Sequence, residues 1–132
     1  MTTGDRSLAL ASLGVLALGL ATTGRSADGP RVEVRSLVTE RRVDVTVDGQ
    51  PFTSYVWPER VSKPILNPIR NARGTIVTRG FPLDPRPGER VDHVHQAGYW
   101  FTYGDVDGVD FWGNSEAIPP AERAKMGVIR HR

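Results

Sequence analysis

Residues 41–57, RRVDVTVDGQPFTSYVW, decide the fold class of this chain. In the first seven residues, apolar and polar side chains alternate with a period of two, as a half-buried strand requires. The pair Asp48-Gly49 follows, and it suits the positive φ angles of a tight hairpin turn. Phe52–Trp57 is then the returning strand, which Pro58 ends. The stretch predicts a β-hairpin in a mainly β protein.

The strand pattern extends upstream to residue 31, whereas prolines interrupt the sequence downstream. Between residues 58 and 88 each proline removes a backbone donor, which excludes a continuous sheet or helix. Within this stretch we expect strand-like segments at Ile65–Arg70 and Thr75–Arg79, joined by a turn at Asn71–Gly74. A long loop, Phe81–Gly88, follows.

Strand character returns in an aromatic-rich segment. Tyr99–Tyr103 and Val109–Trp112 are predicted strands, and Gly104–Gly108 is the turn between them. One short helix is predicted at Pro119–Lys125, because a proline at the start of a helix loses no hydrogen bond. Met126–His131 predicts the beginning of a further strand.

Residues 1–27 have the organisation of an export signal. Arg6 precedes thirteen residues without charge or proline, Leu8–Leu20, which is shorter than the ~20 apolar residues that a membrane span needs. We predict a cleaved signal peptide (1–27) and one domain over 28–132 without a stable membrane span. The protein would then be periplasmic or secreted. An uncleaved anchor and a buried helix are the alternatives.

Charge and cysteine content exclude several classes of function. The chain has 17 Lys and Arg against 15 Asp and Glu, a net charge of +2. No basic run with interleaved aromatics occurs, so we expect no nucleic-acid partner. The absence of cysteine excludes thiolate metal sites and cysteine nucleophiles.

The densest polar cluster is ERVDHVHQ, residues 89–96. His93 and His95 are two residues apart, so in an extended strand they project from the same face. That spacing suits two ligands of one divalent metal ion, with a carboxylate completing the site. Alternatively, one histidine acts as general acid or base while Asp92 or Glu89 orients its other nitrogen. Two surface histidines with no function give the same pattern.

Six aromatic residues lie between positions 99 and 112. Exported β-proteins often stack sugar rings on such side chains, because a pyranose has an apolar face. Trp100 and Trp112 are therefore candidates for substrate binding, and the alternative is that they fill the core. Asp105, Asp107 and Asp110 do not have the spacing of a calcium loop, and the first two are more simply turn residues.

The segment 64–112 resembles the bacterial family named PmoA family protein, a domain of unknown function. The family's motifs are T-R-G-F/Y-P, E-R-x-D-H-P-H-H-x-G-L-W-F and G-D-V-N-G-x-D-F-W. They correspond here to Thr78–Pro82, Glu89–Phe101 and Gly104–Trp112. The chain differs from these motifs at three positions, with Val94 for a proline, Gln96 for the third histidine and Asp107 for an asparagine.

The resemblance covers residues 53–131, and family members continue into further strands. It implies that 28–132 is the amino-terminal part of a PmoA-family β domain. The family is similar to the antiparallel β-sandwich of aldose epimerases and glycoside-binding proteins, a supersandwich. We therefore expect an incomplete sandwich with unpaired edges.

The family's name refers to a methane oxygenase, but the membrane subunit of that enzyme is a multi-span helical protein, and this chain has one short apolar segment. The β-sandwich similarity instead implies an exported carbohydrate-active enzyme that uses a D-H-x-H site. The resemblance suggests three catalytic residues, His93, His95 and Asp92, with Arg79 as a substrate contact. The aromatic segment adds Trp100 and Trp112 as candidate substrate contacts.

In this interpretation the two histidines are also the candidate ligands of a divalent metal ion, and the partner is a carbohydrate-like small molecule. A non-catalytic sugar-binding β-module in which the aromatics bind the ligand is one alternative. A truncated fragment without function is the other.

Overall fold

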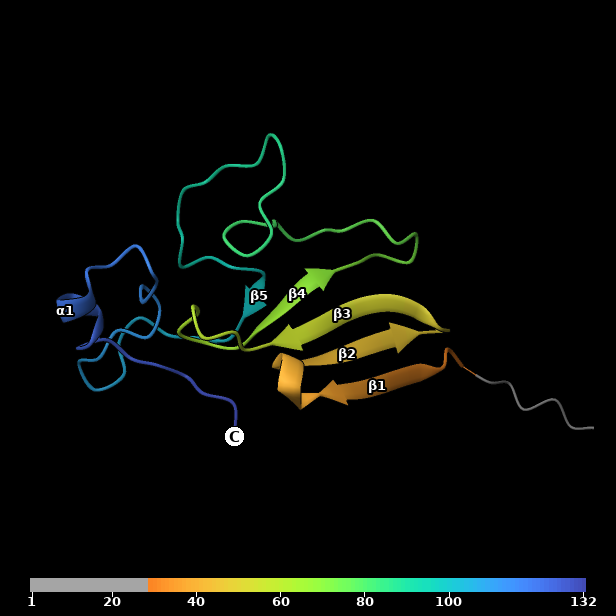
Figure 1. Cartoon of the computed structure of the whole chain (residues 1–132), viewed down its shortest axis with the longest axis horizontal. Coiled ribbons are helices and arrows are strands. Elements are labelled where there is room, and N and C mark those ends of the chain that lie inside the picture. The colour runs from red at the N-terminus through yellow and green to blue at the C-terminus, as the bar shows by residue number, and fades with distance from the viewer. Residues whose placement is uncertain (1–28) are drawn as a thin grey trace, which may run out of the picture.

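The computed structural model describes residues 29–132, so the predicted export signal lies outside the described residues. Five antiparallel strands form one sheet in the order β1-β2-β3-β4-β5 (Figure 1). The strands are β1 (Val32–Leu37), β2 (Arg42–Val47), β3 (Gln50–Val56), β4 (Ile65–Ile69) and β5 (Tyr99–Trp100). Two short helices accompany them, the 3-10 helix η1 (Val38–Glu40) and α1 (Pro120–Arg123). The mainly β, antiparallel fold class is confirmed.

Within residues 29–132, neither helix has the length and apolar character that crossing a bilayer requires.

The central hairpin forms where the sequence predicts it. Asp48 and Gly49 have φ angles of 50° and 74°, the left-handed values that a two-residue hairpin turn needs at both central positions. Val47 and Gln50 pair across the turn, so β3 begins two residues earlier than expected. Upstream, the predicted strand region is divided by η1, and Arg41 takes a left-handed φ of 55° to turn the chain back.

The two faces of the β1–β2 ladder differ in chemistry. Val32 and Val34 lie opposite Val47 and Val45 on one face, whereas the other face is mostly charged and polar, with Leu37 at its end. The two β1 valines are 60% and 67% exposed. The valine face at β1 is therefore open to solvent in the part of the chain that the structure describes.

The buried apolar side chains of residues 29–132 are Ile65, 1% exposed, and Ala97, 4% exposed. Ile65 begins β4, and its Cα pairs with that of Trp100 in β5. Buried polar residues, among them Lys63 and Asn114, lie around the same point. The small core therefore sits where β4 meets the loops that carry the candidate functional residues.

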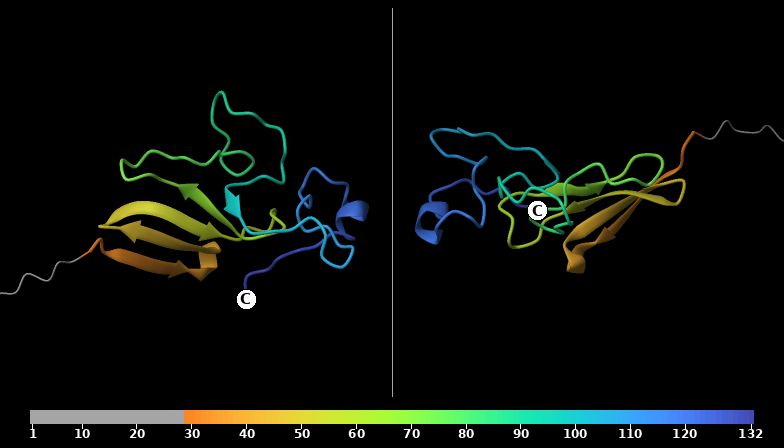
Figure 2. Two further views of the ribbon diagram at one scale, coloured as in Figure 1. Left: turned by 180° about the vertical axis from the view of Figure 1, so that it is seen from behind. Right: turned by 90° about the horizontal axis from the view of Figure 1, so that it is seen from above.

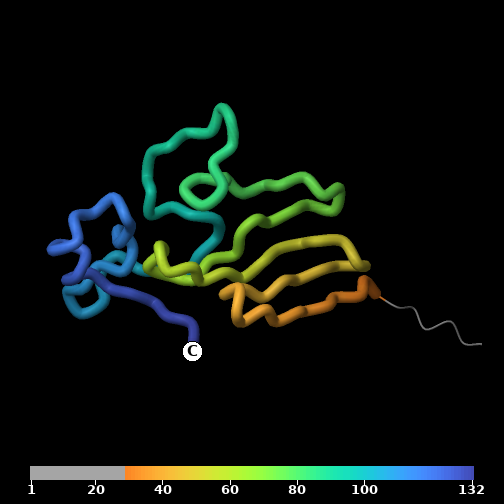
Figure 3. Tube along the Cα trace, in the orientation of Figure 1, coloured from red at the N-terminus to blue at the C-terminus, as the bar shows by residue number. Residues whose placement is uncertain are grey.

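The chain beyond β4 is mostly loop. Residues 70–98 form a long excursion above β4, and residues 101–132 lie beyond one end of the sheet together with α1 (Figures 1 and 3). The last segment returns toward the sheet, where the Ile129 amide donates to the Ser62 carbonyl at 2.9 Å. The loops therefore gather on the β4–β5 side of the molecule.

Several predicted strands in this half are wrong or shorter than expected. Thr75–Arg79 contributes one bridge, between Ile76 and Arg70, and the strand at 99–103 is limited to β5. The predicted strands at 109–112 and 126–131 are absent, with one bridge between Val109 and Val106. The predicted helix is present but shorter, with Pro119 as its N-cap. Alternation alone does not make a strand, because a strand also needs a neighbour to pair with.

Candidate functional site

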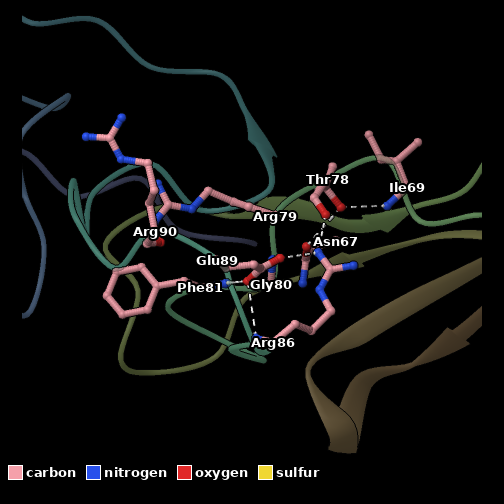
Figure 4. A network of polar contacts seen from close by, with 9 residues as sticks. All are labelled: Asn67, Ile69, Thr78, Arg79, Gly80, Phe81, Arg86, Glu89 and Arg90. Carbon is pink, nitrogen blue, oxygen red and sulfur yellow. Dashed lines mark hydrogen bonds and ion pairs between the residues drawn. The ribbon is translucent and has the colours of Figure 1, made fainter.

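Glu89 anchors the loop that carries the D-H-x-H segment (Figure 4). Its carboxylate accepts the amide of Gly80 at 2.8 and 3.0 Å, that of Phe81 at 3.1 Å and that of Arg86 at 3.3 Å. The guanidinium of Arg86 pairs with it at 2.7 Å. The Gly80 amide is the main reason that the pKa of Glu89 lies below its usual range. Glu89 therefore holds the loop together and does not orient a histidine.

This anchor is connected to the sheet. Arg86 also donates to the Thr78 carbonyl, and the Thr78 hydroxyl accepts the Ile69 amide at 3.1 Å at the end of β4. A side chain at Gly80 would collide with the carbonyl of Asp84, since a Cβ there would lie 1.9 Å from that oxygen. Glycine is thus required where the loop closes on itself.

Arg79 holds the backbone next to the candidate catalytic residues. Its Nη2 donates to the carbonyls of Arg90 at 2.7 Å and Asp92 at 2.8 Å. Its guanidinium carbon lies 5.1 Å from the centre of the Phe81 ring. These contacts position Asp92, and a substrate contact by Arg79 stays a prediction.

Asp92 and His93 form a pair. His93 Nδ1 lies 3.1 Å from Asp92 Oδ2, and Arg90 Nη2 lies 2.9 Å from the same oxygen. Burial acts to raise the pKa of Asp92, but the hydrogen bond from His93 and the charge of Arg90 outweigh it, and the pKa is lowered. Asp92 is thus an anion that orients the His93 ring.

The backbone at this pair is not the extended strand that the sequence predicts. His93 has a φ of 52°, in the left-handed region, and its carbonyl accepts the Gln96 amide at 2.8 Å in a turn. The same-face prediction for His93 and His95 therefore rests on a wrong backbone. A left-handed residue other than glycine costs about 1 kcal/mol, and such costs are often found at functional sites.

His95 lies beside His93 but in different surroundings. The two ring centroids are 5.8 Å apart, and the His95 centroid is 6.1 Å from that of Trp112. Burial, reinforced by the positive charge of Lys63, lowers the pKa of His95. His95 also lines a small cavity of about 20 Å³ with Lys63 and Asn114, enough for about one water molecule.

Trp112 and Trp100 continue this row. Their ring centroids are 5.7 Å apart in an edge-to-face arrangement, and Trp112 is 42% exposed. Lys63, 3% exposed, donates from Nζ to the Trp112 carbonyl at 2.6 Å and lies 5.7 Å from the Trp100 ring centroid. Burial lowers the pKa of Lys63, while the charge of Asp110 opposes the shift. Lys63 thus holds the indole row in place.

The structure divides the predicted site residues between two adjoining places. An open hollow is lined by Arg79, Glu89, Arg90, Asp92, His93 and Gln96. His95 connects this hollow to the two tryptophans. His131, near the C-terminus, lies outside both places, and its ring stacks on that of Trp57 with centroids 3.9 Å apart.

Residues 42–132 match the model of a family of unknown function, DUF6807. The chain belongs to this family. No curated protein and no solved structure matches it. The DUF6807 match contains β2–β5 and every candidate site residue, whereas β1 precedes the matched residues.

Within the DUF6807 segment, His93 and His95 are the two neighbouring imidazoles that could bind a metal ion. Among the residues that the structure describes, no group of three or more His, Cys, Asp or Glu side chains is arranged to hold one. Catalytic zinc sites use three protein ligands, one more than His93 and His95 supply. At the acidic turn, Asp105 Oδ1 accepts the Gly108 amide at 2.7 Å, as expected of a turn residue.

Sequence reasoning missed Lys63 and Asn114, and it assigned Glu89 a different role. Asn114 is 1% exposed and donates from Nδ2 to the Gly127 carbonyl at 2.8 Å, while its Oδ1 has no hydrogen-bond partner. A lone lysine between a serine and a proline carries no signal of burial. Only the packing of residues 63 and 112 against each other reveals its role.

Proposed function

We propose that this DUF6807 chain binds a carbohydrate-like molecule and acts on it by acid–base catalysis, with Asp92 and His93 as the catalytic pair. The 3.1 Å contact between Asp92 Oδ2 and His93 Nδ1 carries the proposal. A carboxylate that holds one ring nitrogen leaves the other, Nε2, to exchange a proton with a substrate hydroxyl.

The surroundings of the pair support this chemistry. The His93 side chain is 56% exposed and borders the open hollow, so a ligand can reach it. Arg90 lies 2.9 Å from one Asp92 oxygen and helps to keep that carboxyl charged, and Arg79 lies 3.9 Å from the other oxygen. His95 is a second imidazole next to His93, and its lowered pKa favours the neutral form. A neutral imidazole is able to accept a proton from the ligand or to bind a divalent metal ion.

A sugar ring needs an apolar surface beside the polar groups. Trp112 provides one, because it is 42% exposed and its ring lies next to that of His95. In the proposal the ligand stacks on Trp112 and places a hydroxyl at His93. Trp100 supports Trp112 from the side and contributes less contact area.

Binding and turnover separate these roles. The full chain is titrated calorimetrically with a panel of neutral and acidic mono- and oligosaccharides, and product formation is followed by chromatography. We expect Trp112→Ala to weaken binding and His93→Gln and Asp92→Asn to keep binding but lower turnover about 100-fold. Binding and turnover unchanged in all three variants would contradict the proposal.

Matched controls come from the other aromatic cluster. Trp57→Ala and His131→Ala remove the same residue types at a stacked pair away from the hollow, and neither is expected to change turnover. Mass spectrometry tests the metal-ligand role of the two histidines. It compares the metal content of the wild type with that of the double variant His93→Ala/His95→Ala.

The second candidate function is a non-catalytic sugar-binding module. Three exposed aromatic side chains close together in the sequence favour it, since Tyr99, Phe101 and Tyr103 are 65%, 88% and 68% exposed. In that case Trp112→Ala or Phe101→Ala abolishes binding, while His93→Gln binds as the wild type does and no sugar is turned over.

We also propose that the protein acts outside the cytoplasm, in the periplasm or after secretion. The apolar segment Leu8–Leu20 and the small residues that follow it support this location. Fractionation of cells that express the full chain, with mass determination of the mature amino terminus, tests it.

A further inference from the structure

The outer edge of β1 is unpaired in the part of the chain that the structure describes. β1 is the first strand of the sheet order, and Figure 2 shows it at the rim of the sheet. It contains six residues, VEVRSL, without proline or bulge. A regular edge of this kind presents backbone donors and acceptors to another strand.

The ladder with β2 determines which backbone groups face outward. The Asp48 amide donates to the Arg31 carbonyl, which makes Arg31 and Asp48 a hydrogen-bonded pair. Because such pairs alternate along an antiparallel ladder, the odd-numbered residues of β1 bond to β2. The N–H and C=O groups of Val32, Val34 and Ser36 therefore point to the free edge.

Charge selects one register for a copy of β1 in the opposite direction. With Val34 opposite Val34 of the second copy, Glu33 of each strand lies opposite Arg35 of the other. Shifting by two residues in either direction places Glu33 opposite Glu33 or Arg35 opposite Arg35, and like charges directly opposite are destabilising. In the favoured register, Val32 of each copy also lies opposite Ser36 of the other, so the outward-facing backbone groups of the two strands can bond to one another.

We propose that two copies of this chain associate through β1, in antiparallel register about Val34, to form one continuous sheet. Three residue pairs exchange about six backbone hydrogen bonds, and two Glu33–Arg35 pairs flank the centre. The Val34 side chains of the two copies lie next to each other on the valine face. This face is therefore continuous across both molecules. The proposal concerns assembly and does not depend on the proposed catalytic pair.

The association closes at two copies. The interface is two-fold symmetric, so each β1 edge is used once. The opposite edge of the sheet is β5, which has two residues and offers no comparable ladder. We therefore expect a dimer that forms with increasing concentration, without growth into fibres.

A proline at the centre of the edge tests the backbone pairing. Val34→Pro removes an outward-facing N–H and leaves the bonds to β2 intact, as an edge position allows. Sedimentation velocity of the full chain should show a dimer for the wild type and a monomer for this variant, with unchanged far-ultraviolet circular dichroism. A monomeric wild type, or a dimer that Val34→Pro leaves intact, overturns the proposal.

Charge reversal tests the register independently. Glu33→Arg and Arg35→Glu each create two like-charge pairs and should be monomeric alone. Mixed together, they restore two opposite-charge pairs and should form a heterodimer. A mixture that stays monomeric while both variants fold overturns the register.

A cross-link gives a direct measurement, because the chain has no native cysteine. Val34→Cys places two thiols at Cα positions about 5.5 Å apart, within the range of a disulfide. It should cross-link to a dimer on mild oxidation. Val77→Cys, at a position 62% exposed compared with 67% for Val34, is the matched control and should not cross-link at the same rate. Equal cross-linking of both variants overturns the proposal.

Discussion

The sheet and the loops that follow it are stabilised by different interactions. In β1–β4, backbone ladders hold neighbouring strands together, and the side chains of β1 are left largely exposed. In residues 70–132, side chains supplement the backbone hydrogen bonds of the turns and of α1. Glu89 accepts three amides, Asp110 accepts those of Trp112 and Gly113, and Asn114 bonds the Gly127 carbonyl.

This difference shows how a chain can hold an irregular site without regular secondary structure. A buried or half-buried backbone donor needs an acceptor. Where no strand provides one, a carboxylate or an amide side chain takes its place. The His93 turn lies in such a segment, after the Glu89 anchor and before Ala97, which is buried in the same small core as Ile65. Changing the anchors should therefore affect the loops selectively, whereas changing the shared core should affect both regions.

The largest effect is expected at Ile65, where the two regions meet. Ile65→Ala removes a side chain that is 1% exposed and enlarges the adjoining cavity. The free energy of unfolding should fall by about 3 kcal/mol, measured by urea denaturation. Leu66→Ala, at the half-buried neighbouring position, is the control and should cost less. Equal losses would show that the core is not centred on Ile65.

The next largest effect is expected in the loop that Glu89 anchors. Glu89→Gln removes the charge and one of the two oxygens that accept loop amides, so residues 80–92 should exchange their amide hydrogens roughly tenfold faster or more. The amides of β2 and β3 should keep their protection. Hydrogen exchange measured by NMR checks both. Glu116→Gln, at an exposed carboxylate, is the control, and loss of sheet protection in Glu89→Gln would contradict the separation of the two regions.

Acid should weaken the same anchor in the wild type. The pKa of Glu89 is lowered in the folded chain, chiefly by the Gly80 amide, so its contribution is complete above its unfolded pKa of about 4.3. That contribution is lost as the pH falls through the lowered folded value. Loop exchange should accelerate over this acidic range in the wild type and change less in Glu89→Gln. An identical pH response in both proteins would remove Glu89 as the cause.

The smallest effects are expected at exposed valines in either region. Val38 in η1 is 64% exposed and Val77 in the loops is 62% exposed. Threonine at either position should change the free energy of unfolding by less than about 0.5 kcal/mol, measured by thermal melts. A large change at one position and not at the other would show that the region of the molecule, and not the exposure of the side chain, determines the loss of stability.

Local sequence patterns predict the regular half of the molecule well. The alternation in 41–47, the Asp48-Gly49 turn and the returning strand are all present. The turn at Asn71–Gly74 is confirmed as well, with the Asn71 side chain accepting the amides of Arg73 and Thr75. Each of these features depends on residues close together in the chain, so a short window contains the information.

The candidate site is predicted less completely. The sequence singles out Asp92, His93 and Trp112, and the structure places them in one continuous row through His95. The sequence does not reveal that the backbone of His93 lies in a left-handed turn. That conformation depends on the Glu89 anchor and on the contacts of Arg79, which connect positions up to thirteen residues apart.

By itself, the sequence determined that this protein is mainly β, where its hairpin turns, and which residue types gather in the D-H-x-H segment. Only the tertiary structure decided that Glu89 is an anchor, that Asp92 pairs with His93, and that Lys63 is buried against Trp112, 49 positions away. The physical reason is the distance along the chain over which each interaction acts. Period-two alternation and turn preferences act between neighbours along the chain, whereas the satisfaction of buried polar groups depends on whichever segments the fold brings together.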